Sequence, residues 1–275
     1  MNCKLIACDL DGTLLCDDSS ISNENLNAIH RIKNNGIEFV INTGRTLYEI
    51  PKELLNDADI RYIIHSDGSV IYDKASSKIL QSRYIDTETA LKLFKLLDSF
   101  DTMIGFYVNG HPVTDIKKLS CQSYEYFNID KNYRPVMDLT RKGVENLEKY
   151  ISENDKIELI NIFFKYPKER NHCAEILKEK FDIQFTTSMD NNIEITAKSI
   201  SKGMALKKLC DILQIKKENV IALGDSKNDI TMFDFAGTSL CAGNASDVVK
   251  EYADKQVCSN NEHIAEYICR NILGV

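Results

Sequence analysis

Short apolar runs alternate with amphipathic stretches in the first part of the chain. The runs Cys3–Cys8, Ile37–Ile41 and Tyr62–Ile64 each have the length of one strand, and the segments between them carry apolar residues at helical spacing. Such runs are typical of parallel strands that are buried on both faces. The order strand–helix–strand–helix–strand therefore predicts a doubly wound, Rossmann-like α/β core. Residues 70–82 differ, because two short strand patterns flank a polar turn there.

The pattern changes from about Tyr84. A helical stretch is followed by two apolar runs around Asn109-Gly110, a dipeptide that favours a hairpin turn. Further helices and strands are expected at 143–152, 156–165, 168–180 and 181–188. This mixture predicts an α+β domain with antiparallel pairing, inserted at residues 83–188 into a core made of residues 1–82 and 189–275.

The doubly wound pattern resumes after the insertion. We assign Ile193–Ile195 to the core, together with two buried strands at Val220–Leu223 and Ser239–Cys241. Between Ile195 and Val220, Ser201-Lys202-Gly203 opens an amphipathic helix. In an open parallel sheet, ligands bind outside the carboxyl ends of the strands, so the residues that follow each core strand are the candidates for chemistry.

Composition narrows the class of protein. The 275 residues carry a net charge of −7 with a pI near 5.4, which argues against nucleic acid or an anionic membrane as partner but permits a small anionic substrate. No apolar run approaches the roughly 18 residues of a membrane span, and no secretion signal is visible. The nine cysteines form no C-x-x-C pair, so we expect free thiols in a cytoplasmic protein. None of these features defines the oligomeric state.

Polar residues gather at four places where predicted core strands end or core helices begin. These places are Asp9/Asp11, Thr43/Gly44/Arg45, Lys202 and Asp225/Asn228/Asp229. Parallel neighbouring strands would bring them to one edge of the sheet. Four carboxylates in one place repel one another unless a cation lies between them, and an oxygen-only ligand set suits Mg²⁺. Together with hydroxyls and a lysine, such a site can receive a phosphoryl group.

The spacing of the acids suggests separate tasks. A carboxylate at a strand tip, such as Asp9, can attack phosphorus and form an acyl phosphate. Asp11 lies on the same side of the chain, so it can give a proton to the leaving oxygen and later remove one from water. Thr43 and backbone N–H groups would bind phosphoryl oxygens, and Lys202 would balance the charge of Asp9 and the phosphoryl group.

At these residues the sequence resembles the haloacid dehalogenase (HAD) superfamily of phosphohydrolases, and within it the Cof-type branch with an α+β (type IIB) cap. The resemblance covers essentially the whole chain. Its motifs are Asp9-Leu10-Asp11-Gly12-Thr13-Leu14, Asn42-Thr43-Gly44-Arg45, Ser201-Lys202-Gly203 and Gly224-Asp225-Ser226-Lys227-Asn228-Asp229. It implies that the insertion is a cap that closes over the site and selects the substrate.

The resemblance also implies a role for each site residue. Asp9 would be nucleophile and metal ligand, Asp11 would be acid/base and lend its backbone carbonyl to the metal, and Asp225 would complete the protein ligands. Phosphate or substrate would be bound by Thr43, Gly44, Arg45, Lys202 and Asn228, and Asp229 would support Lys202 or the metal's waters. The chain departs from the family at Asp67, where relatives often have Asn, and at 259–264, which lacks an Asp-Gly. Neither departure is expected to touch the chemistry, but both are expected to affect the rim of the site.

The sequence therefore predicts a magnesium-dependent phosphohydrolase that acts on small phosphorylated metabolites, such as sugar phosphates or related monoesters, through an aspartyl phosphate. The intact Asp11 counts against a dehalogenase, and the missing spans count against a transport ATPase. One alternative is a sugar phosphomutase or phosphotransferase that passes the phosphoryl group to a hydroxyl. The other is a non-catalytic module that binds a phosphometabolite, which would have no need of both Asp9 and Asp11.

Overall fold

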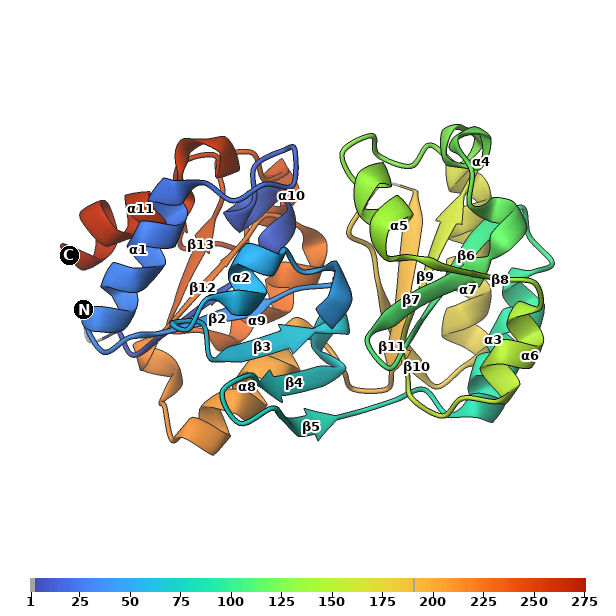
Figure 1. Ribbon diagram of the computed structural model, residues 1–275, viewed down its shortest axis with the longest axis horizontal. Coiled ribbons are helices and arrows are strands. Elements are labelled where there is room, and N and C mark those ends of the chain that lie inside the picture. Colours follow the sequence, from blue (N-terminus) through green and yellow to red (C-terminus); the bar gives the residue numbers. More distant parts are fainter. Residues whose placement is uncertain (1–2, 190) are drawn as a thin grey trace. The chain divides into compact units, whose positions relative to one another are not determined.

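The chain folds into two compact units, each built around its own β-sheet (Figure 1). The computed structural model describes residues 3–189 and 191–275. The core unit comprises the described residues up to Gly44, Ile50–Ser82 and Ser201–Val275. The inserted unit comprises Arg45–Glu49 and Arg83–Ile200.

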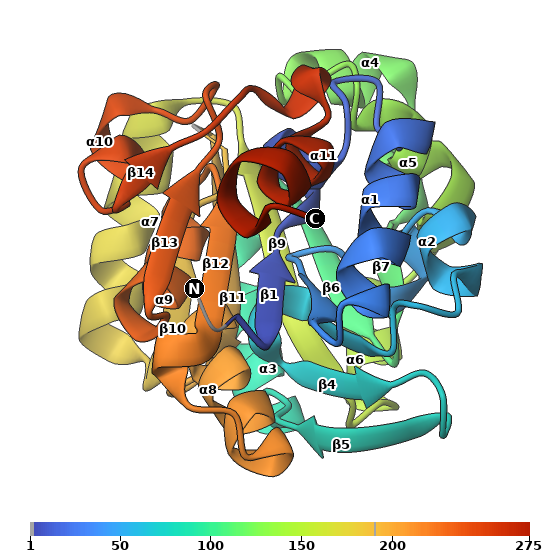
Figure 2. The ribbon, with the colours of Figure 1, turned by 90° about the vertical axis from the view of Figure 1, so that its left-hand side faces the viewer.

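The core unit contains an eight-stranded sheet with the order β14-β13-β12-β1-β2-β3-β4-β5. The strands are β1 (Leu5–Cys8), β2 (Glu38–Asn42), β3 (Tyr62–His65), β4 (Val70–Asp73), β5 (Lys78–Ser82), β12 (Val220–Gly224), β13 (Thr238–Cys241) and β14 (Lys255–Gln256). The strands from β14 to β3 are parallel, and β4 and β5 add an antiparallel edge. Figure 2 shows β13, β12 and β1 side by side. The predicted α/β core is thus confirmed.

Helices cover this sheet. They are α1 (Asn23–Asn34), α2 (Lys52–Asn56), α8 (Lys202–Leu213), α9 (Ile230–Phe235), α10 (Asp247–Lys250) and α11 (Ile264–Ile268). Leu5 and Ala7 of β1 share one apolar cluster with α8 and α9. Ile6 and Cys8, which alternate to the opposite face, are also fully buried. Both faces of β1 are therefore covered, as the continuous apolar run predicted.

The inserted unit contains a six-stranded sheet with the order β10-β11-β9-β6-β7-β8. The strands are β6 (Thr102–Val108), β7 (His111–Asp115), β8 (Lys142–Val144), β9 (Ile157–Phe164), β10 (Ile183–Thr186) and β11 (Asn192–Ala197). Neighbours pair antiparallel except β7 and β8. The turn between β6 and β7 is the predicted Asn109-Gly110, where both residues have positive φ.

The two faces of this second sheet differ in what covers them. The helices are α3 (Thr87–Leu97), α4 (Cys121–Tyr126), α5 (Arg134–Thr140), α6 (Leu147–Ser152) and α7 (Pro167–Lys180). Helices α3, α6 and α7 pack on Ile104, Phe106 and their neighbours in one large apolar cluster. A smaller cluster joins Met103 and Phe163 to α4 and α5, and alternation along β6 puts it on the opposite face.

The predicted return to the core at residue 189 is wrong. Ile193–Ile195 lie in β11, which pairs antiparallel with β9 and β10 in the inserted unit. The strand alternates apolar and polar residues, and its isoleucines pack into the cluster with α3, α6 and α7. The inserted unit extends to Ile200 and also takes in Arg45–Glu49, which the sequence had placed in the core. No helix among residues 3–189 and 191–275 is long and apolar enough to cross a membrane.

Candidate active site

The loop that follows β1 brings its acids to the end of the parallel sheet. The backbone N–H of Asp9 donates to the carbonyl of Leu223 in β12, and the chain then makes a wide turn over Leu10–Leu14. Gly12 has φ +71°, and a Cβ at this position would lie 2.4 Å from Oδ2 of Asp225. Only glycine satisfies both the left-handed backbone and the close approach of the carboxylate. The glycine of the first motif thus lets Asp225 come next to the loop of Asp9.

Lys202 lies between two of the predicted acids. Its Nζ donates to Oδ1 of Asp9 at 2.8 Å and to Oδ1 of Asp229 at 2.7 Å, and its side chain is 1% exposed. The lysine is held at the first turn of α8, where the side chain of Ser201 caps the helix by accepting from Met204 N–H. A buried ammonium with two carboxylate partners is a fixed charge, since its hydrogen bonds leave it little freedom.

Asp229 and Asp225 have different surroundings. Oδ2 of Asp229 accepts from the backbone N–H groups of Asp225 and Ser226, each at 3.0 Å, while Oδ1 is held by Lys202. Both oxygens of Asp229 therefore serve to position its neighbours. Asp225 accepts at Oδ1 from the hydroxyl of Thr13 at 2.9 Å, which orients the carboxylate and leaves the second oxygen as a possible ligand atom.

The pKa values of the site residues indicate more negative charge than Lys202 alone balances. Burial raises the pKa of Asp9 well above its usual range, and the charge of Asp229 raises it further. Burial, followed by Asp229, raises the pKa of Asp225 to about 7. Burial would lower the pKa of Lys202, but Asp229 and Asp9 outweigh burial and raise it. The site therefore favours an additional positive charge.

The donor set fits a hard divalent cation. Carboxylate oxygens of Asp9, Asp225 and Asp229 lie within 4.8 Å of one another. The set contains oxygen ligands alone, which suits Mg²⁺ better than a metal that prefers nitrogen or sulfur. Since Asp229 already uses both oxygens, Asp9 and Asp225 are the side chains of this group that fit as ligands.

A second group of polar residues lies at the ends of β2 and β3. Nδ2 of Asn228 donates to Oδ1 of Asp67 at 3.0 Å, and the backbone N–H of Asp67 donates to the carbonyl of Thr43 at 3.1 Å. A Cβ on Gly44 would lie 3.2 Å from Oδ1 of Asp67. Asp67, which the sequence analysis did not count among the site residues, is therefore bonded to one of them, Asn228. The available signal was its place directly after a buried strand, as for the other acids.

Two further residues predicted for the site, Asp11 and Arg45, differ from the buried acids in their surroundings. Asp11 is exposed, and its charge contributes to the raised pKa of Asp225, so it lies near the acids. Arg45 belongs to the inserted unit, where its Nη1 donates to the backbone carbonyl of Glu49 at 2.8 Å. The structure thus brings Asp9, Lys202, Asp225 and Asp229 into one cluster and attaches Arg45 to the other unit.

Comparison with known families identifies the chain. Residues 6–268 match the family of haloacid dehalogenase-like hydrolases. The chain belongs to this family. The resemblance carried by the four motifs is thereby confirmed, and the chain is a phosphatase of this family, a phosphoric monoester hydrolase.

Individual relatives align with nearly the whole of this chain. Phosphatase YwpJ of Bacillus subtilis is 28% identical, with 98% of this chain and 100% of that protein covered. The B. subtilis 5-amino-6-(5-phospho-D-ribitylamino)uracil phosphatase YcsE is 32% identical, with 94% and 91% covered. The solved structure of a haloacid dehalogenase-like hydrolase from B. subtilis is 25% identical with a TM-score of 0.85, and 98% and 99% of the two chains are covered.

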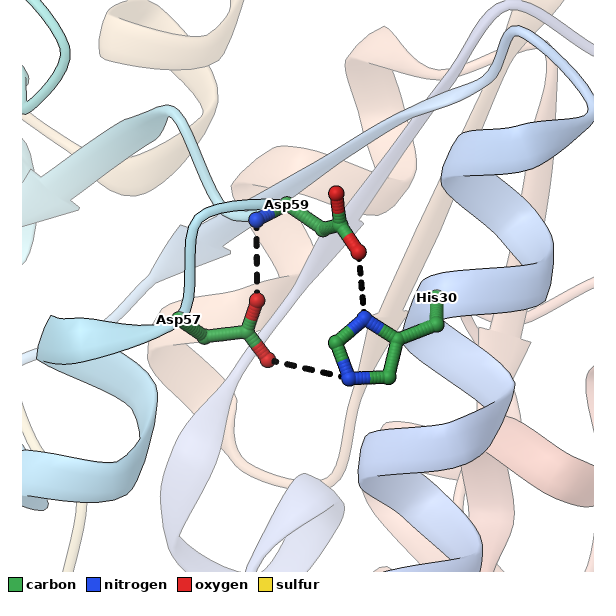
Figure 3. Close-up of side chains that lie close together, drawn as sticks. All are labelled: His30, Asp57 and Asp59. Atoms are coloured by element: carbon green, nitrogen blue, oxygen red, sulfur yellow. Dashed lines mark hydrogen bonds and ion pairs between the residues drawn. The ribbon is translucent and has the colours of Figure 1, made fainter.

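A further group of titratable residues lies elsewhere in the core unit of the hydrolase (Figure 3). His30 of α1 contacts Asp59 through Nδ1, and its Nε2 lies 3.9 Å from Oδ2 of Asp57. Asp57 also accepts from the backbone N–H of Asp59 at 2.8 Å. Both ring nitrogens of His30 thus face carboxylates, which is the arrangement of an imidazolium between two anions. The hydrogen bond to Asp59 raises the pKa of His30.

This pairing predicts a pH-dependent contribution to stability. Because the folded-state pKa of His30 is raised, its contribution is complete below the unfolded value of about 6.5 and is lost as pH rises through the folded value. We expect His30→Gln to lower the free energy of unfolding by up to about 1 kcal/mol at pH 5.5 and by nothing measurable at pH 9. Urea unfolding at both pH values measures this, with His172→Gln in α7 as control. An equal loss at both pH values would contradict the ion pair.

Proposed function

We propose that the hydrolase removes phosphate from small phosphorylated metabolites through an aspartyl phosphate on Asp9, with Mg²⁺ as cofactor. The observation that carries the proposal is the position of Asp9 at the carboxyl end of β1, bonded to Lys202 and close to Asp225. A carboxylate placed there has one oxygen held by a fixed cation and a second oxygen as attacking atom. Bound Mg²⁺ would supply charge stabilisation for the transferring phosphoryl group.

The two steps divide between Asp9 and Asp11. In the first, a carboxylate oxygen of Asp9 forms a bond to phosphorus while the bond to the alcohol oxygen breaks, and Asp11 gives its proton to that oxygen. In the second, water attacks the same phosphorus, Asp11 takes a proton from the water, and the carboxylate of Asp9 leaves. Free phosphate and the two original carboxyl groups result, so the cycle closes.

The remaining residues would hold the phosphoryl group and the acids. Lys202 balances the negative charge on the Asp9 carboxylate and on the phosphoryl oxygens. Thr43, Gly44, Arg45 and Asn228 would donate hydrogen bonds to phosphate or substrate. Asp229 would keep Lys202 in place, as its hydrogen bond at 2.7 Å supports. Asp67 would orient Asn228 through the bond between their side chains.

We further propose that the inserted unit selects the substrate and that sugar phosphates or related monoesters are its substrates. The relative YcsE is described as a phosphatase of a phosphoribityl compound, which is a polyol phosphate. A cytoplasmic location remains a prediction; the nine cysteines are free, as expected there.

The test is phosphate release by the purified protein from an aryl ester, p-nitrophenyl phosphate. We expect hydrolysis in Mg²⁺, a loss of at least about 100-fold after treatment with EDTA, and recovery when Mg²⁺ is restored, since the metal stabilises charge worth several kcal/mol. Product analysis with an added polyol acceptor separates hydrolysis from phosphotransfer. Unchanged activity in EDTA would exclude the metal, and absence of hydrolysis with tight binding of one ester would favour a binding module.

A further inference from the structure

The first turn of α8, which carries Lys202, is capped by side chains from two segments. The first N–H groups of a helix have no acceptor within the helix. Met204 N–H donates to Oγ of Ser201 at 3.2 Å, which is the ordinary cap of this helix. Gly203 N–H donates at 3.0 Å to Oγ1 of Thr231, which belongs to α9 and follows 28 positions later. The helix of Lys202 is thus capped a second time, by a residue of another helix.

Thr231 is also bonded to the loop that carries the acids. Its Oγ1 donates to the backbone carbonyl of Asn228 at 3.2 Å. A threonine in a helix can bond in this way to a carbonyl of the preceding turn. A hydroxyl has one proton to donate and lone pairs that accept, so the bonds to Asn228 and Gly203 can form together. The hydroxyl therefore links the first turn of α8 to the loop of Asn228 and Asp229.

The backbone around Lys202 is held on both sides. A Cβ on Gly203 would lie 1.9 Å from the carbonyl oxygen of Thr231, so any other side chain here would force α8 and α9 apart. Both helices contribute to the same apolar cluster. Nδ2 of Asn42, at the end of β2, donates to the carbonyl of Lys202 at 3.0 Å. The lysine thus starts from a fixed point between β2 and α9.

The position of this backbone decides where the ammonium of Lys202 donates. An ammonium has three N–H donors, and the bonds to Asp9 and Asp229 use two of them. The direction of the third then depends on where the Cα of the lysine lies relative to the two acids. Charge stabilisation in a catalytic site requires donors that are aimed before the reaction starts. A misplacement of about 1 Å can cost about 100-fold in rate.

We propose that Thr231 is a positioning residue for phosphoryl transfer. Its hydroxyl holds the first turn of α8 against the loop of Asn228 and Asp229, and this aims the third N–H of Lys202 at the phosphoryl oxygens. Thr231 acts through Lys202 and does not itself touch the substrate. The inference rests on the proposed function, in which Lys202 balances the charge of the phosphoryl group.

Thr231→Val tests the link, because valine keeps the shape of the side chain and lacks the hydroxyl. In Mg²⁺, we expect kcat/KM for p-nitrophenyl phosphate to fall by about tenfold or more and the inhibition constant of inorganic phosphate to rise by about fivefold or more. Thr231→Ser retains the hydroxyl, so both values should stay within about twofold of wild type. Thr238→Val in β13 makes the same chemical change elsewhere in the core unit and should alter neither value.

A second ester shows whether the effect passes through Lys202. The lysine acts on the phosphoryl group and not on the leaving oxygen, so Thr231→Val should lose the same factor with phenyl phosphate, a poorer leaving group, as with p-nitrophenyl phosphate. Each variant is assayed well below its own melting temperature, which removes general loss of stability from the comparison. If Thr231→Val does not fold, Thr231→Ala takes its place with the same expectations, since alanine favours the helix.

The outcomes separate this inference from the proposed function. A folded Thr231→Val protein that loses no more activity than Thr231→Ser would overturn the inference, while hydrolysis by the wild type still supports the proposed function. A larger loss with phenyl phosphate would attribute the effect to the proton transfer of Asp11 and would also overturn it. If the wild type hydrolyses no ester, the proposed function fails, and calorimetry with inorganic phosphate decides. Weaker binding to Thr231→Val than to wild type then supports the inference, and equal binding, or no binding to either protein, rejects it.

Discussion

Asp9→Asn is expected to lower kcat by about 10⁴-fold or more with every phosphate ester. The amide is a poor nucleophile and cannot form the acyl phosphate, whereas its size preserves the hydrogen bond that Lys202 Nζ donates to Oδ1. The measurement is release of p-nitrophenol together with a search for the phosphorylated protein by intact mass. Wild-type activity in Asp9→Asn would show that the attacking atom belongs to another residue.

Asp11→Asn is the matched comparison, because it changes a neighbouring carboxylate in the same way. Loss of an acid/base group costs about 10²–10⁴-fold, and the loss should be smallest for esters with good leaving groups, which need no proton in the first step. Asp9→Asn should show no such dependence. Equal losses across leaving groups in Asp11→Asn would rule out the proton transfer assigned to this residue.

Lys202→Met should destabilise the fold as well as abolish phosphate binding. The change leaves Asp9 and Asp229 buried without the cation that bonds to both, at 2.8 and 2.7 Å. Breaking a buried ion pair by removing one partner costs about 3–5 kcal/mol. Without the ammonium, which lowers the pKa of Asp9, the folded-state pKa of this carboxyl rises further above the unfolded value. Stability is then retained at low pH and lost as pH rises, so the deficit should be larger at pH 8 than at pH 5.5.

Urea unfolding at the two pH values measures this deficit. Lys207→Met, on the exposed side of α8, removes the same charge from the same helix and should change stability by less than about 0.5 kcal/mol. A Lys202→Met protein as stable as wild type at pH 8 would contradict the stabilising role of the two buried ion pairs.

The core and its acids could be predicted because their signals are local. A short apolar run identifies a buried strand, and the polar residues directly after it identify the end of the sheet where ligands bind. Asp9 and Asp225 follow this rule, whereas Lys202 was found as the first residue of a core helix. The three lie together although up to 216 positions separate them along the chain. Asp67 obeys the same rule, but its part in the site depends on a bond to Asn228, 161 residues away.

The boundaries of the inserted unit could not be predicted as accurately as the core and its acids. Ile193-Glu194-Ile195 is only three residues long, and so short a pattern does not tell whether the strand joins the parallel or the antiparallel sheet. Its partners, β9 and β10, decide that. Arg45–Glu49 directly follows a core motif, so nothing in its composition separates it from the core; the contacts of Glu49 with Tyr133 and Arg141 attach it to the inserted unit.

The fold class, the family and the candidate acids follow from residue types and from their place relative to neighbouring strands, so they can be read without a structure. The hydrogen-bond partners of each acid depend on the tertiary structure. It showed that Asp229 uses both oxygens to position Lys202 and the loop of Asp225. These properties come from contacts between segments far apart in the chain, which no local pattern records.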